Sequence, residues 1–180
     1  LRSRRQLVEL DRTRRVAAIL VDAAEVIGAG RGRQQVHAAL QQRLGRGAVP
    51  TLSLAQNTLL TRTQTVSGAG WISTNRVRLL AEHIINRFSV EAGGTEAVAK
   101  SLSGGNLQKF IVGREIDADP KLLIVSQPTW GVDVGAAALI RGELLKLRDA
   151  GCALLVVSEE LDELFEISDR LIVIAQGRMS

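Results

Sequence analysis

Apolar residues follow two different periods along the chain, and the change falls near Ser101. Before that point the pattern is mostly helical, and residues 6–28 and 33–45 carry apolar positions near helical spacing. The run VAAILV inside the first stretch is equally compatible with a buried strand. Residues 73–90 predict an amphipathic helix with four apolar residues on one side: Val77, Leu80, Ile84 and Phe88.

Short polar and glycine-containing segments separate these helical patterns. The stretch LAQNTLL follows a serine that can cap a turn of helix, residues 65–70 predict a loop, and residues 91–100 predict a flexible connector. We expect Trp71 and Phe88 to belong to the core of this helical part, because bulky aromatic residues are commonly buried.

After Ser101 aliphatic strands alternate with helices. The pattern predicts, in chain order, a helix, a strand, a helix, a strand, a short acidic helix and a strand, over residues 104–117, 121–126, 135–149, 152–158, 159–167 and 170–175. This alternation is typical of a parallel sheet covered by helices, so the fold class is α/β.

Composition narrows the class of protein further. The 180 residues suit one domain, and 46% hydrophobic with 23% charged residues indicate a globular protein. Aromatic residues make up only 3%, so stacking platforms for single-stranded nucleic acid are scarce. The net charge of +4 comes largely from arginines before residue 50, which a solvated face explains more simply than a nucleic-acid surface. The single cysteine, Cys152, lies in an apolar run and favours a buried thiol in a reducing compartment.

The segment SLSGGNLQKF carries the strongest chemical signal. A serine, Ser103, is followed by Gly104 and Gly105 at the start of a helical pattern. Without a Cβ, glycine lets a ligand approach the backbone closely, and a helix N-terminus attracts anions. Asn106 and Gln108 add side-chain amides nearby. Standing alone, SGG is also compatible with a flexible cap before a helix.

The order of motifs after this segment is specific. The strand KLLIVSQPT follows, then GVDVGA, then LLVVSEELDELFEISDRLIVIAQGRM. The set resembles the signature motif, Walker B strand, D-loop and switch region of the ATP-binding-cassette (ABC) ATPases. Ser126 lies 24 positions after Leu102, the separation expected in that family. Residues 43–60 and 76–90 resemble the region that leads into the helical subdomain of sugar and nucleoside import ATPases. More narrowly, SGGN and GVDVGA resemble the second cassette of the tandem ATPases that serve simple-sugar importers.

The resemblance covers residues 43–180 and implies an incomplete P-loop NTPase-like domain. We expect an atypical arginine-rich segment over 1–42, a loop and helical subdomain over 43–100, and an α/β core over 101–180. In the family two cassettes meet head to tail with ATP between them. The resemblance therefore implies that Ser103, Gly104 and Gly105 contact the γ-phosphate of ATP held by the other cassette.

Further roles follow from the same resemblance. Asn106 and Gln108 are expected near the ribose or across the interface, and Asp133 of the D-loop is expected to couple the two halves. Trp130 stands where these importers often have arginine, and we expect it to serve packing rather than recognition.

The catalytic apparatus of the family is missing from the sequence. No G-x-x-x-x-G-K-[ST] phosphate loop occurs, and the nearest stretch, residues 26–40, reads either as a degenerate loop or as an arginine-rich turn. Ser126, Gln127 and Glu159 stand in place of the magnesium-side aspartate, the catalytic glutamate and the switch histidine. Glutamine cannot accept a proton from the attacking water, and a carboxylate at 159 would repel a phosphate. His37 and His83 have no second ligand at metal-binding spacing, so no metal site is expected.

The expected function is an ATP-binding subunit or domain of an ABC importer for simple sugars or nucleosides, itself non-catalytic. ATP and Mg²⁺ would be held mainly by a second cassette. The other expected partners are membrane permease subunits, whose coupling helix would contact residues 51–100, and indirectly a periplasmic or lipoprotein substrate-binding protein. The expected location is peripheral, on the cytoplasmic face of the cell membrane, without nucleic acid. Two alternatives stay open: a truncated or decayed cassette, and a basic nucleic-acid-binding protein on an ATPase-like fold.

Overall fold

The computed structural model describes residues 16–21, 47–68, 71–175 and 178–179. Within these residues no helix has the length and apolar character needed to cross a membrane. The helices predicted over 6–28 and 33–45 and the stretch 26–40 lie outside the described residues, apart from the run Val16–Val21. That run is a strand, so the second interpretation of VAAILV is confirmed.

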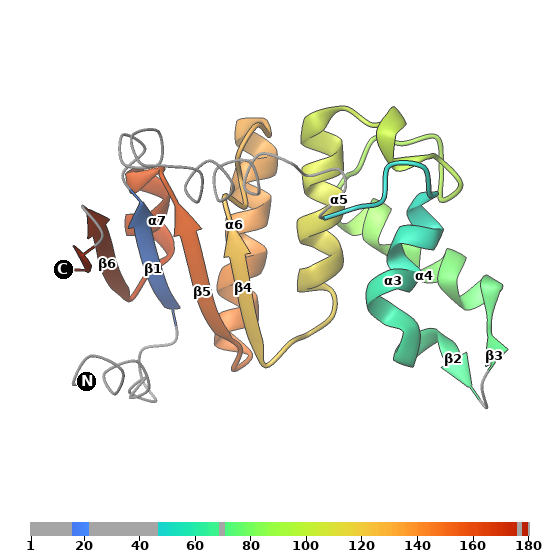
Figure 1. Cartoon of the computed structure of the whole chain (residues 1–180), viewed down its shortest axis with the longest axis horizontal. Coiled ribbons are helices and arrows are strands. Elements are labelled where there is room, and N and C mark those ends of the chain that lie inside the picture. Colours follow the sequence, from blue (N-terminus) through green and yellow to red (C-terminus); the bar gives the residue numbers. More distant parts are fainter. Residues whose placement is uncertain (1–15, 22–46, 69–70, 176–177, 180) are drawn as a thin grey trace.

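One sheet organises the α/β part of the molecule (Figure 1). Its strand order is β4-β5-β1-β6-β7, and all neighbours are parallel except β6 and β7, which are antiparallel. The strands are β1 (Val16–Val21), β4 (Leu122–Ser126), β5 (Ala153–Ser158), β6 (Arg170–Ala175) and β7 (Arg178–Met179). Because β1 lies between β5 and β6, the sheet is built jointly by residues from the N-terminal segment and from residues 122–179.

Helices connect the parallel strands. α6 (Val134–Asp149) joins β4 to β5, and α7 (Leu161–Ile167) joins β5 to β6. Ile140 and Leu144 of α6 are fully buried together with Val156 of β5, because their apolar faces pack into one core. The alternation predicted after Ser101 is thus confirmed, with bounds that shift by one or two residues.

A helical subdomain lies at the other end of the molecule (Figure 1). It contains α3 (Leu54–Val66) and α4 (Thr74–Arg87), joined by the short antiparallel strands β2 (Ser67–Gly68) and β3 (Trp71–Ile72). The apolar side predicted for residues 73–90 is confirmed, since Val77, Ile84 and Phe88 are buried and Leu80 is partly buried. Of the predicted loop over 65–70, residues 65–66 belong instead to the end of α3 and 67–68 to β2, and 69–70 lie outside the described residues.

The two aromatic residues expected in the subdomain core behave differently. Phe88 is fully buried, but Trp71 is 83% exposed, so the prediction for Trp71 is wrong. Trp71 belongs to the β2–β3 hairpin, where a two-residue strand offers no packed face that could cover an indole.

The helix α5 (Gly104–Ile116) stands between the subdomain and the sheet, and a short 3₁₀ turn, Ala99–Ser101, precedes it. Phe110 of α5 is fully buried, and Gly113 packs so closely on Phe88 that a Cβ there would lie 2.5 Å from the ring. Only glycine permits this approach of α5 to the end of α4.

Ionic contacts reinforce the same junction. Arg87 at the end of α4 contacts Asp117 after α5 and Glu143 on α6, and Lys146 also bonds Glu143 at 2.7 Å. Burial raises the pKa of Glu143, but the hydrogen bonds from Lys146 and Arg87 outweigh it, so the pKa lies below its ordinary value. The carboxylate therefore stays ionised and links the helical subdomain to α6.

Candidate functional site

The N-terminus of α5 presents an exposed hydroxyl. Ser103 is the N-cap, in an extended conformation, and its Oγ accepts hydrogen bonds from the backbone N of Asn106 at 3.3 Å and from its Nδ2 at 3.1 Å. Asn106 Oδ1 in turn accepts from the backbone N of Glu91 at 3.0 Å. Ser103 and Gly104 are exposed. The hydroxyl is held in place by its neighbour and still has its own proton to donate.

Gly105 brings the start of α5 against the loop that follows β4. A Cβ on Gly105 would lie 3.1 Å from the backbone O of Gly131 and 3.7 Å from Cα of Val132. Gly131 itself has φ of +67°, a conformation that glycine adopts without strain. The two glycines therefore allow the helix start and the loop to touch through their backbones.

Gln108 makes a second link between the same two elements. Its side chain is buried, and Nε2 donates to the backbone O of Gln127 at 2.9 Å and of Pro128 at 3.0 Å. The amide is thus directed into the chain and away from the solvent. Gln108 was predicted to approach a nucleotide, but its side chain holds the loop after β4. Ser103, Gly104 and Asn106, which were predicted to do the same, lie at the start of α5.

Asp133 ends this loop and begins α6. Its Oδ1 accepts from the backbone N of Ala136 at 2.9 Å, which makes Asp133 the N-cap of α6. This backbone hydrogen bond lowers the pKa of Asp133 below its ordinary value. The carboxylate is exposed and negatively charged, close in sequence to the loop residues that contact Gly105.

The carboxyl ends of β4 and β5 lie at one edge of the sheet, since the strands are parallel and Ser126 pairs with Val157. Gln127, just after β4, is 8% exposed and has φ of +50°, a strained value for a residue with a side chain. Its backbone N donates to Val157 O at 2.7 Å, and its backbone O accepts from Gln108. Two hydrogen bonds thus hold the peptide groups that flank this strained residue.

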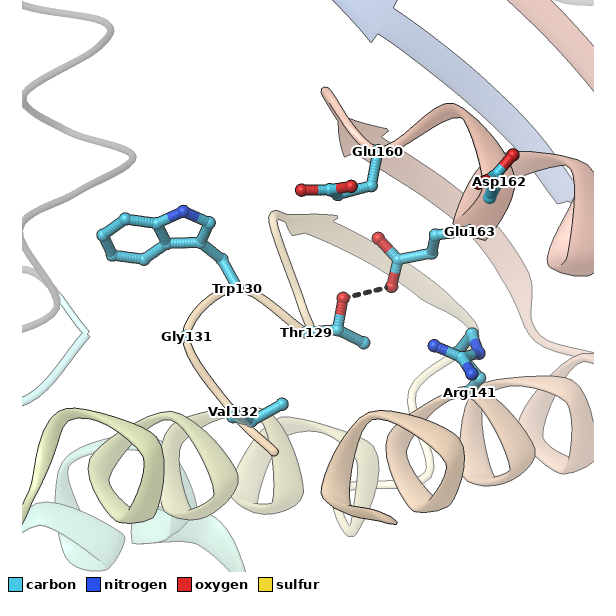
Figure 2. Close-up of a pocket in the computed structure, with 8 residues that line it drawn as sticks. All are labelled: Thr129, Trp130, Gly131, Val132, Arg141, Glu160, Asp162 and Glu163. Atoms are coloured by element: carbon cyan, nitrogen blue, oxygen red, sulfur yellow. Dashed lines mark hydrogen bonds between the residues drawn. The ribbon is translucent and has the colours of Figure 1, made fainter. Parts of the chain in front are cut away.

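A buried polar chain continues from Gln127 toward α7. Ser158 Oγ lies 3.3 Å from Gln127 Oε1 and 2.9 Å from Glu163 Oε2, and Thr129 Oγ1 donates to Glu163 Oε1 at 2.6 Å (Figure 2). Gln127, Ser158 and Glu163 are all buried. No local pattern predicts this chain of contacts, because Thr129 and Glu163 are 34 positions apart in the sequence.

A pocket of about 330 Å³ opens beside this chain, between the loop and α7 (Figure 2). It is lined by Thr129, Trp130, Gly131, Val132, Arg141, Glu160, Asp162 and Glu163. Trp130 is 44% exposed, so the expectation that it serves packing alone is not supported by its burial. The lining contains three carboxylates and one arginine, and Arg141 Nε is 2.8 Å from Glu166 Oε2. The lining therefore disfavours a polyphosphate.

The strand-end residues do not fit a magnesium ion. Ser126 Oγ is buried and neutral, without a hydrogen-bond partner among the described residues, and the Gln127 side-chain oxygen faces Ser158. Mg²⁺ prefers carboxylates and waters in octahedral geometry. Glu159, predicted to stand at the position of a switch histidine, is only partly exposed. Within the described part of the chain no group of three His, Cys, Asp or Glu residues could hold a metal ion.

The chain has curated relatives, although no family model matches it. The nucleoside import ATP-binding protein NupA of Lactococcus lactis is 44% identical over 138 residues, 74% of this chain and 27% of that protein. The ribose import ATP-binding protein RbsA 2 of Rhizobium meliloti is 37% identical over 140 residues, 78% of this chain and 27% of the relative. The guanosine import ATP-binding protein NupO of Bacillus subtilis is 40% identical over 141 residues, 77% of this chain and 28% of its own length. The chain thus spans about a quarter of the length of these relatives.

Solved structures share the fold. The dimeric structure of a bacterial ABC transporter cassette aligns with a TM-score of 0.68 and 18% identity, over 92% of this chain and 84% of that one. A dimeric post-hydrolysis state bound to ADP and Pi aligns with a TM-score of 0.70 and 16% identity, over 96% and 87%. The predicted α/β, P-loop NTPase-like fold and the predicted resemblance to ABC import ATPases are confirmed.

Proposed function

We propose that this chain, which has the ABC ATPase fold and is homologous with ABC import ATP-binding proteins, completes an ATP site whose nucleotide is held by a second cassette. The observation that carries the proposal is the exposed hydroxyl of Ser103 at the N-terminus of α5, a helix of 13 residues. The partial positive charge of that terminus and the hydroxyl proton both favour the γ-phosphate of ATP.

The residues around Ser103 have supporting roles in this proposal. Asn106 fixes the serine oxygen, and Gly104, which has no Cβ, lets a phosphate approach its backbone N–H closely. Gly105 and Gln108 tie the helix start to the loop that ends at Asp133. A second cassette that contacts Asp133 would therefore also fix the position of Ser103, which is how the loop would couple the two halves.

The chain itself is proposed to be non-catalytic. Gln127 is a neutral amide and cannot take a proton from water, and Ser126 brings no charge to balance Mg²⁺. Glu159 at the end of β5 adds a negative charge that opposes a bound polyphosphate. ATP and Mg²⁺ would therefore belong to the partner cassette, where this chain supplies hydrogen bonds and the helix terminus.

The names of the relatives suggest the wider assembly. Ribose, nucleosides and guanosine are what those proteins are said to import, so a simple sugar or nucleoside is the proposed cargo. The proposed partners are a second cassette, permease subunits that contact the helical subdomain over residues 51–100, and a substrate-binding protein acting through the permease. The chain would lie peripherally on the cytoplasmic face of the membrane.

A reconstitution tests the proposal. The chain is mixed with a full-length cassette that carries an intact phosphate loop, and the ATPase rate of the mixture is measured. We expect the chain to raise the partner's rate, and Ser103→Arg to abolish the increase because a bulky cation displaces the hydroxyl. Ser73→Arg is the matched control, since Ser73 caps α4 in the same way through the backbone N of Arg76.

The control separates loss of a helix cap, worth about 1 kcal/mol in both variants, from loss of the phosphate contact. If Ser73→Arg and Ser103→Arg reduce the rate equally, the hydroxyl has no special role and the proposal fails. If the unaltered chain never associates with any cassette, it is a decayed cassette without a transport function.

A further inference from the structure

The β2–β3 hairpin exposes apolar side chains at the end of the helical subdomain that lies farthest from the sheet (Figure 1). Trp71 is 83% exposed and Ile72 is 47% exposed, and both belong to β3. Leu79, in the second turn of α4, is 57% exposed and points away from the buried side of that helix. Large apolar groups gathered at an exposed tip indicate a contact surface rather than a core.

The hairpin carries no acidic residue, and arginines lie beside it. The sequence has no acidic residue between Glu25 and Glu82, a stretch that includes all of α3, the hairpin and the first two turns of α4. Arg76 and Arg78 are exposed on the first turns of α4, beside the hairpin. Only Glu96 approaches them among the described ion pairs, 2.9 Å from Arg78. The tip is therefore cationic as well as apolar.

This combination matches the chemistry of a phospholipid surface. Indole is enriched at membrane interfaces because its ring is amphipathic, and arginine binds lipid phosphate while its stem covers apolar surface. Anionic lipids attract cationic segments within a Debye length of the surface, and a hairpin without acidic residues adds no repulsion of its own. A protein groove would also accept Trp71, but two exposed arginines beside a hairpin that has no acidic residue favour an anionic partner.

We propose that the β2–β3 hairpin docks on an anionic phospholipid surface, with Trp71 and Ile72 at the headgroup boundary and Arg76 on lipid phosphate. Arg78 would interact with the lipid phosphate while it keeps its ion pair with Glu96. This contact needs neither ATP nor a second cassette, so it goes beyond the proposed function and can fail separately from it. A single hairpin gives weak, reversible binding that would add to the permease contact.

Tryptophan fluorescence tests the contact directly, because the chain contains only two tryptophans. In the Trp130→Phe variant Trp71 is the sole indole, and in the Trp71→Phe variant Trp130 is. Each full-length variant is titrated with vesicles of phosphatidylglycerol and phosphatidylcholine, and with vesicles of phosphatidylcholine alone. We expect the emission of Trp71 to shift to shorter wavelength only with the anionic vesicles, and to be quenched by brominated lipid acyl chains.

Variants that remove one positive charge show how much an arginine contributes to lipid binding. Removing one arginine near the surface is expected to weaken binding about fivefold, so Arg76→Gln should raise the lipid concentration for half-maximal shift by that factor. Lys121→Gln, at an exposed position before β4, should leave it unchanged. Far-UV circular dichroism of each variant confirms that the fold is intact.

Four results would overturn the proposal. They are an unchanged Trp71 spectrum on anionic vesicles at low salt, an equal shift on neutral vesicles, an equal shift from Trp130, and equal weakening by Lys121→Gln and Arg76→Gln. A Trp71 shift that appears only when permease is added would also overturn it, and would assign the hairpin to a protein partner.

Discussion

Gly113 offers the sharpest test of how α5 is held, because its substitution places a single methyl group against a buried ring. A Cβ at this position would lie 2.5 Å from both Cγ and Cδ2 of Phe88, whereas ordinary contact begins at 3.4 Å. Phe88 is fully buried at the end of α4 and cannot swing into solvent. Either the ring or α5 must therefore move by about 1 Å.

The expected cost is a balance of two effects. Overpacking of this kind costs about 1–3 kcal/mol, and the clash with two ring atoms places Gly113→Ala near the upper end. Alanine in a helix interior returns about 1 kcal/mol relative to glycine. The net expectation is a loss of about 2 kcal/mol in the free energy of unfolding, measured by urea titration with far-UV circular dichroism.

Two further variants make the measurement decisive. Gly142→Ala, within α6, meets nothing within 4 Å and should stabilise the chain by up to about 1 kcal/mol, as helix propensity alone dictates. In a Phe88→Leu background Gly113→Ala should cost at least about 1 kcal/mol less, because the branched side chain can yield. If Gly113→Ala is as stable as the unaltered chain, or if its cost persists in the Phe88→Leu background, the close packing of α5 on α4 is refuted.

Three other predictions concern the site and its supports. Gly105→Ala should weaken stimulation of a partner's ATPase and also lower the unfolding free energy by about 1–2 kcal/mol, because its Cβ would lie 3.1 Å from the backbone O of Gly131, which can yield only slightly. Thr129→Val should cost about 1.5–3 kcal/mol in urea unfolding by removing a donor from buried Glu163, while Thr129→Ser should cost less; equal costs would contradict the hydrogen bond. Glu143 has a depressed pKa, so its stabilisation is complete above its ordinary pKa of 4.5 and is lost as the pH falls below it. The stability difference between the unaltered chain and Glu143→Gln, measured by urea unfolding across pH, should therefore shrink below about pH 4.5, and a constant difference would refute this.

Local patterns in the sequence predicted most of the elements after residue 73. Aliphatic strands and amphipathic helices are set by short-range periodicity, so β4, β5, β6 and α4–α7 were predicted to within a few residues. The position of Ser103 at an exposed helix start also follows from its local N-cap chemistry. The exposure of Trp71 was missed because hydrophobicity alone does not tell a core residue from one at a hairpin tip.

The remaining features depend on contacts between distant parts of the chain. The run Val16–Val21 is ambiguous by itself, and only pairing with β5 and β6 makes it a central strand. Gln108 was expected beside a nucleotide, but two backbone carbonyls 19 and 20 positions away bury its amide. The close contact between Gly105 and the backbone of Gly131 could not be predicted from the sequence either, since each glycine alone is compatible with an ordinary turn.

The distribution of altered and intact features bears on the choice between a working non-catalytic half and a decayed cassette. On the predicted correspondence with ABC ATPases, Ser126, Gln127 and Glu159 stand at positions that would handle a proton, a metal or a phosphate within the chain's own site. The contacts that hold the helix start, which we propose serves a partner, are present: the Ser103 cap, the Gly105 contact and the buried amide of Gln108. Random mutation would alter both groups of residues equally, because a substitution of Gly105 arises as easily as a substitution at position 127. The asymmetry supports a chain kept for what it offers to another nucleotide site, and the reconstitution with Ser103→Arg tests that directly.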